Sequence, residues 1–162
     1  MTLIILLVLG GVVATYNPPQ MTTERVIELI PVGDVANLNA WIYKNIRYAK
    51  DVDSDDQWKN AWQTITEGEG DCEDRAAVGI AVISKWDGWK AHMVVISRKT
   101  ITGRRVRHAV CGYESPDGRR GIIDGKVIES KDWGGVFEQT YYDEAEFVDS
   151  RGNKLNITGW TR

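Results

Sequence analysis

The chain has 162 residues and a formal net charge of −3, from 20 Lys and Arg against 23 Asp and Glu. A hydrophobic fraction of 43% and a charged fraction of 27% exclude an intrinsically disordered chain, a collagen-like repeat and a disulfide-dense miniprotein. The acidic balance also argues against nucleic acid as a partner, because phosphate binding needs a basic surface. We therefore expect one folded domain that binds no nucleic acid.

Residues 1–20 are predicted to be a signal peptide or an N-terminal membrane anchor, followed by a spacer. The run from Leu3 to Ala14 carries no charge. It is shorter than the roughly 20 residues of a membrane-spanning helix, but it is typical of the apolar region of a secretion signal. Pro18 and Pro19 then favour an extended spacer. The alternative interpretation is a buried N-terminal strand.

On the first interpretation, the folded domain covers residues 21–162 and the protein is exported, to the periplasm or the medium, or is held at a membrane. Only the N-terminal segment would touch that membrane. A cytoplasmic location and any oligomeric state stay open at this point.

Three helices are predicted in the first half of the chain, over Gly33–Tyr48, Gln57–Ile65 and Cys72–Trp86. In the first of them, apolar residues recur at helical spacing on one face. The third contains many small apolar residues, which allows a helix to be buried on most sides. Asp34 and Asp71 are the expected N-caps of the first and third helices.

The second half of the chain is predicted to be β-structure. Strands are expected over Ala91–Arg98, Val106–Tyr113 and Gly121–Ile128, with further strand-like pieces over Val136–Tyr141 and Leu155–Trp160. Ser115-Pro116-Asp117-Gly118 is a strong turn signal between the second and third of these strands. Helices followed by consecutive strands indicate an α+β fold in which N-terminal helices pack on an antiparallel sheet.

Cys72 is a candidate nucleophile because it falls in the first turn of a predicted helix, directly after a glycine-rich turn. A helix N-terminus stabilises a thiolate, and its free N–H groups can hold the oxyanion of an acyl-transfer intermediate. The backbone N–H of Cys72 is one expected oxyanion donor. The side chains of Gln57, Trp62 and Gln63 are open alternatives for the second.

His108 and Asp124 are the candidate base and orienting carboxylate. A hairpin centred between Pro116 and Asp117 places His108 opposite Asp124 within one residue of register. Cross-strand neighbours have Cβ atoms about 4.5–5.5 Å apart, which suits a carboxylate that accepts a hydrogen bond from an imidazole.

A rival pair, His92 and Cys111, also faces across a predicted hairpin. Both residues fall in the middle of a strand, away from any helix terminus, so we expect a structural histidine and a core cysteine.

A different class of protein also stays open. In a non-catalytic secreted binding domain, Cys72 and Cys111 would form a disulfide.

Three segments together resemble a known family. They are Gly70-Asp71-Cys72-Glu73-Asp74, His108-Ala109-Val110 and Ile122-Ile123-Asp124-Gly125. In this order they resemble the transglutaminase-like superfamily, and most of all the bacterial transglutaminase-like cysteine peptidases.

The resemblance implies a papain-like α+β fold and a triad of Cys72, His108 and Asp124. It also implies attack on a peptide or glutamine amide bond of a protein or peptide substrate, through a thioester intermediate and with no required cofactor. A cysteine peptidase is the leading interpretation, and a protein-glutamine transamidase or deamidase is the alternative.

Five carboxylates lie within eight residues around Cys72, and negative charge there raises the pKa of a thiol. The carboxylates can point to solvent, a protonated His108 can compensate them, or a bound cation can neutralise them. Some exported members of the resembled family bind calcium beside the nucleophile. That resemblance implies a calcium site at Asp71 and Glu73.

Overall fold

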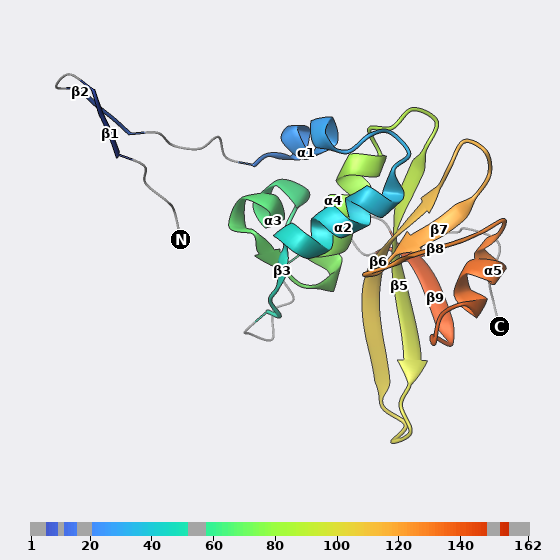
Figure 1. The fold of residues 1–162 in the computed structure, drawn as a ribbon. Helices are drawn as coiled ribbons and strands as arrows, with labels where there is room; N and C mark the ends of the chain where they lie inside the picture. Colours follow the sequence, from blue (N-terminus) through green and yellow to red (C-terminus); the bar gives the residue numbers. More distant parts are fainter. Residues whose placement is uncertain (1–5, 10–11, 16–20, 52–57, 149–152, 156–162) are drawn as a thin grey trace.

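The structure is a computed structural model that describes residues 6–9, 12–15, 21–51, 58–148 and 153–155 (Figure 1). At the N-terminus, β1 (Leu6–Leu9) and β2 (Val12–Thr15) pair with each other as an antiparallel hairpin. The interpretation of residues 1–20 as a signal or an anchor stays a prediction. Within the described ranges, no helix has both the length and the apolar character needed to cross a membrane.

A five-stranded antiparallel sheet forms the centre of the fold, in the order β8-β7-β6-β5-β9. Its strands are β5 (Lys90–Lys99), β6 (Arg105–Glu114), β7 (Arg120–Ile123), β8 (Val127–Ser130) and β9 (Glu144–Val148). The long β5–β6 hairpin pairs along its whole length, whereas β7 pairs with β6 only from Cys111 to Glu114. The first half of β6, which carries His108, therefore extends beyond its pairing with β7.

Four helices precede the sheet in the chain and lie together on one side of it (Figure 1). They are α1 (Thr23–Leu29), α2 (Val35–Asn45), α3 (Ala61–Glu67) and α4 (Cys72–Ile83). A short parallel pair, β3 (Arg47–Tyr48) with β4 (Glu69–Gly70), joins the end of α2 to the turn before α4. The predicted α+β class, with N-terminal helices packed on an antiparallel sheet, is confirmed.

Strand alternation divides the interior into two apolar clusters, one on each face of the sheet. Cys111 and Tyr113 of β6 pack with α4 on one face. Val110 of the same strand and Ile122 of β7 pack on the other face with α5 (Trp133–Glu138). The sheet is thus buried on both sides, which fixes its register and the positions of residues at its edges.

The predicted strand Gly121–Ile128 is two strands in the structure, with a three-residue turn between β7 and β8. Asp124-Gly125 makes this turn, and Gly125 has a φ of +67°, a region that glycine enters without strain. Asp124 therefore lies in a loop at the end of β7, not within a strand.

The tail also differs from its prediction. Val136–Tyr141 was expected as strand, but its first part belongs to α5, which begins after the N-cap Asp132 and buries Trp133, Val136 and Phe137 at helical spacing. Strand β9 was not predicted. Of the expected piece Leu155–Trp160, only Leu155 lies among the described residues, and its N–H bonds to the carbonyl of Phe147 at 2.7 Å.

Candidate active site

The first turn of α4 is held by a buried carboxylate. Asp74 is 1% exposed and accepts hydrogen bonds from the backbone N–H of Lys59 at 2.8 Å and of Asp71, the N-cap, at 3.3 Å. Gly70 precedes them, and a Cβ there would lie 2.5 Å from the Cβ of Asp74. Glycine at position 70 therefore lets the backbone pass close to Asp74, whose carboxylate can then bond the N–H of Asp71. These contacts set the position of Cys72.

Cys72 is half-buried against β6 and beside a carboxylate. The backbone N–H of Ala109 donates toward its sulfur, which lowers the thiol pKa. The sulfur also donates to Oε2 of Glu73 at 3.0 Å. Burial and the Glu73 carboxylate outweigh the Ala109 contact and raise the pKa of Cys72 to about 12. In this arrangement the thiol is held in its protonated form.

The five carboxylates around Cys72 divide into two groups. Glu67 pairs with Lys59 at 2.8 Å and Glu69 pairs with Arg47, so both are balanced away from the thiol. Asp71 and Glu73 are each only 7% exposed, and Asp74 is buried with them. Exposure to solvent therefore does not explain how the protein tolerates the charges of the three carboxylates nearest to Cys72.

His108 and Asp124 are brought into contact, with 2.7 Å between Nε2 of the histidine and Oδ1 of the aspartate. The β6–β7 register differs by two residues from the one that would set them directly opposite, since Cys111 pairs with Ile123. Asp124 reaches the histidine diagonally from the β7–β8 turn. The ring of Tyr142 stacks on His108, with centroids 6.2 Å apart.

Helix α2 supports the turn that carries Asp124, a role that the sequence analysis did not predict. Asn39 donates to the carbonyl of Gly125 at 3.2 Å, and the hydroxyl of Tyr43 donates to Oδ1 of Asp124 at 3.4 Å. Burial and the Asp124 charge raise the pKa of Tyr43 to about 12. The available signal was that Asn39 and Tyr43 lie one helical turn apart, and so share a face.

Arg75 connects this support to the nucleophile helix. Its guanidinium lies 4.6 Å from the ring centroid of Tyr43 and donates to the carbonyl of Ile46 at 2.6 Å. Because Arg75 and Cys72 share α4, the helix that carries the candidate nucleophile also contacts the ring of Tyr43, which bonds Asp124.

Cys72 and His108 line the same open cavity, of about 370 Å³. The other lining residues come from the chain around β3, the stretch before α3, the start of α4, and strands β5 and β6: Tyr48, Lys50, Trp58, Asp71, Glu73, Val95, Arg107 and Ala109. The fold therefore brings Cys72 and His108 to one cavity although they are far apart in sequence, because α4 packs against β6.

The rival pair is not assembled as predicted. Met93, not His92, pairs with Cys111, and His92 lies opposite Gly112. Cys111 is buried and packs on Gly79, where an added Cβ would lie 3.0 Å from its sulfur.

Both cysteines are free thiols. Gly79 lies seven residues beyond Cys72 on α4, or about 10 Å along the helix axis. A disulfide needs Cα atoms within about 7 Å. The packing of Cys111 therefore does not favour a Cys72–Cys111 disulfide.

Of the candidates for a second oxyanion donor, the two that the structure describes, Trp62 and Gln63, do not line the cavity. Gln63 accepts from the backbone N–H of Asn60 at 3.1 Å and so caps α3. Trp62 is exposed and does not line the cavity of Cys72. Gln57 lies outside the described residues. Trp58, from the same stretch, does line the cavity.

Asp71 and Glu73 fit a hard cation in chemistry and spacing. One ligand atom from each of Asp71, Cys72 and Glu73 lies within 4.8 Å of the others. Oδ1 of Asp71 is buried and has no hydrogen-bond partner among the described residues. Carboxylate oxygens are the ligands that calcium prefers.

No family model matches the sequence, and a comparison with curated proteins gives no match. Among solved structures, calcium-bound LapG of Legionella pneumophila is similar at 19% identity and a TM-score of 0.54, over 83% of this chain and 76% of that one.

Two more LapG structures from the same organism match at 19% identity and a TM-score of 0.41. The first covers 69% of this chain and 78% of that one. The second, EGTA-treated, covers 70% and 77%. The similarity to calcium-bound LapG shows that this chain shares its fold.

Proposed function

We propose that the protein is a cysteine peptidase in which Cys72 is the nucleophile, His108 the general base and Asp124 the residue that orients the imidazole. One observation carries the proposal: His108, hydrogen-bonded to Asp124, lines the same cavity as a cysteine in the first turn of a helix. The similarity in fold to LapG and the resemblance of the sequence to transglutaminase-like peptidases support it.

The hydrogen bond from Nε2 to Asp124 leaves Nδ1 of His108 to take the proton of the Cys72 thiol. The thiolate attacks the carbonyl carbon of the scissile amide, and the N–H groups at the start of α4 stabilise the oxyanion. His108 returns the proton to the leaving amine as the tetrahedral intermediate collapses to a thioester. Water, deprotonated by His108, then hydrolyses the thioester and restores the thiol.

Calcium is part of the proposal, with Asp71 and Glu73 as its ligands. When bound, the ion supplies positive charge that offsets the carboxylates beside Cys72. The unpartnered Oδ1 of Asp71 supports the site, and so does the calcium-bound form of LapG.

We also propose that residues 1–20 direct export or hold the protein at a membrane, and that residues 21–162 form the catalytic domain.

The test compares wild type, Cys72→Ser and Cys111→Ser on a peptide mixture, with calcium or EGTA, and with products read by mass spectrometry. We expect new peptide termini from wild type and Cys111→Ser, and none from Cys72→Ser. Iodoacetamide should label Cys72 of the folded protein in preference to the buried Cys111.

Deamidated glutamine, or an added amine joined to glutamine, would instead identify the same triad as a deamidase or transamidase. Products that persist in Cys72→Ser would contradict the proposal. So would wild type that forms no product with calcium.

A further inference from the structure

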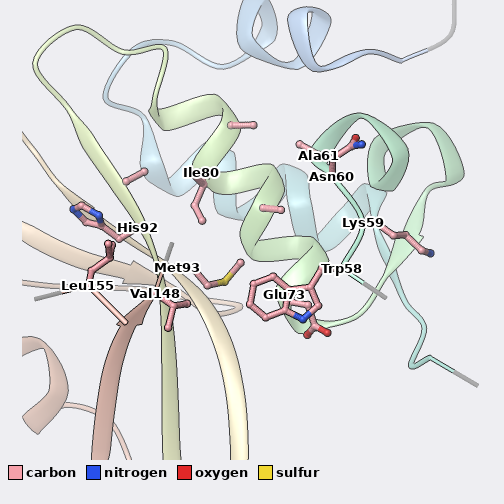
Figure 2. Close-up of a pocket in the computed structure, with 13 residues that line it drawn as sticks. Trp58, Lys59, Asn60, Ala61, Glu73, Ile80, His92, Met93, Val148 and Leu155 are labelled. Atoms are coloured by element: carbon pink, nitrogen blue, oxygen red, sulfur yellow. The ribbon is translucent and has the colours of Figure 1, made fainter. Parts of the chain in front are cut away.

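A second cavity, of about 360 Å³, lies beside the one that holds Cys72 (Figure 2). It opens between α4 and the sheet. Its apolar walls come from α4, β5 and β9 and from Leu155 near the C-terminus: Ala77, Ile80, Ala81, Ala91, Met93, Val148 and Leu155. Its volume is near the lower end of the range for ligand pockets, about 300–1,000 Å³.

The sequence of α4 accounts for this space. Glu73, Ala77 and Ile80 recur at helical spacing, so they share one face of the helix, and Ala81 lies next to Ile80. The alanines place only a methyl group where a larger side chain would reach the sheet. Met93 and Val148, buried on β5 and β9, close the opposite side.

The two cavities are neighbours along α4. Trp58 and Glu73 line both of them, and Glu73 directly follows Cys72. Ile80 lies about 10 Å along the helix from Glu73, at a rise of 1.5 Å per residue. An extended peptide covers that distance in about three residues.

Polar groups surround the end of the second cavity near Cys72. In Figure 2, Trp58 and Glu73 lie together at one end, Lys59 and Asn60 lie farther off toward α3, and His92 lies near Leu155 at the opposite end. An apolar interior with a polar, charged rim suits a single apolar side chain whose backbone stays outside.

We propose that this second cavity binds a large apolar side chain of the substrate, such as Leu, Met or Phe, within about three residues of the bond that Cys72 attacks. This inference rests on the proposed peptidase function and adds the class of residue that the enzyme selects. The binding of that side chain removes apolar surface of both partners from water, in a pocket next to the one that Cys72 lines.

The experiment measures kcat/KM on a peptide series in which one position at a time, up to three residues from the cleaved bond, carries Leu, Phe, Ala or Asp. Wild type should prefer Leu or Phe over Ala by about 10- to 100-fold at one position, the range typical of apolar specificity pockets. Ala81→Phe should fill the cavity and remove most of that preference, while Ile80→Ala should enlarge it and favour Phe over Leu.

Ala36→Phe is the matched control, since Ala36 is exposed on α2 and lines neither cavity. It should keep the wild-type preference. Iodoacetamide labelling of Cys72 and the melting temperature of each variant show that the nucleophile and the fold are retained.

The outcomes separate this inference from the proposed function. Wild type that cleaves no peptide contradicts the peptidase. Wild type that cleaves without an apolar preference, or a preference that Ala81→Phe leaves intact, contradicts only the role of the cavity. If Ala81→Phe instead changes the oligomeric state by light scattering and leaves the preference intact, the cavity is an interface between copies and the inference is wrong.

Discussion

The two ends of the candidate active site are built in different ways. At the nucleophile end, Asp71, Cys72 and Glu73 are consecutive in sequence, and burial together with the Glu73 carboxylate raises the thiol pKa to about 12. At the histidine end, His108 comes from β6 and Asp124 from the β7–β8 turn, and a hydrogen bond of 2.7 Å joins them.

The contacts of the histidine end are thus already formed, whereas the thiol at the nucleophile end is held in its protonated form. Tyr43 bonds Asp124 and Asn39 bonds the carbonyl of Gly125, so α2 holds the turn that carries Asp124. Glu73, by contrast, holds the proton of Cys72 in place. Activation of the proposed peptidase should therefore depend on changes at the carboxylates, while the histidine end should respond mainly to loss of its own contacts.

The largest effect is expected at the histidine end. Asp124→Asn should lower kcat by about 10³- to 10⁴-fold, because an amide cannot hold the imidazole in the tautomer that accepts the Cys72 proton. Steady-state kinetics on a cleaved peptide measure this. Asp117→Asn, in the exposed β6–β7 turn, is the control and should stay close to wild type. A loss below tenfold in Asp124→Asn would show that the imidazole is oriented by other groups.

A change at the nucleophile end should act in the opposite direction on thiol reactivity. Glu73→Gln removes the carboxylate that helps to raise the pKa of Cys72, so a larger fraction of thiolate forms at any pH below about 12. In EGTA at pH 8, we expect the rate of Cys72 alkylation by iodoacetamide to rise about tenfold, with its pH profile shifted to lower pH. Glu69→Gln, whose carboxylate pairs with Arg47, should leave the rate unchanged. An unaltered pH profile in Glu73→Gln would mean that burial alone sets the pKa.

Tyr43→Phe tests whether the histidine end needs its support from α2. Loss of the hydrogen bond to Asp124 should lower kcat by about 3- to 10-fold and leave KM unchanged, because Tyr43 acts through Asp124 and lies outside the two cavities. A loss of melting temperature with kcat unchanged would indicate a packing role only.

The smallest effect concerns the second histidine, outside the proposed triad. Burial lowers the pKa of His92 below its ordinary value, so the unfolded chain binds more protons than the folded one below about pH 6.5. Stability should therefore rise as the pH rises from 5 to 6.5 and then level off. His92→Gln should flatten this rise by a few degrees in melting temperature, measured by calorimetry. A rise of equal size in His92→Gln would show that other groups cause the increase in stability with pH.

Local signals predicted much of this protein. Helix periodicity and the caps Asp34 and Asp71 indicated α2 and α4, and the glycine-rich turn placed Cys72 at a helix start. Turn chemistry indicated the β6–β7 hairpin, and the order of the elements indicated the α+β class. These features depend on residues within a few positions of one another, so a single sequence contains the information.

Only the tertiary structure decided the rest. The register of β7, the turn at Asp124-Gly125 and the support from Tyr43 depend on burial of both sheet faces and on contacts between residues 81 or more positions apart. The segment 133–138 has apolar residues that suit a strand, yet it is a helix because a second apolar cluster covers it. Likewise, the buried carboxylates beside Cys72 and the apolar cavity along α4 exist because the helix packs on the sheet, and packing of this kind is not encoded in any local pattern.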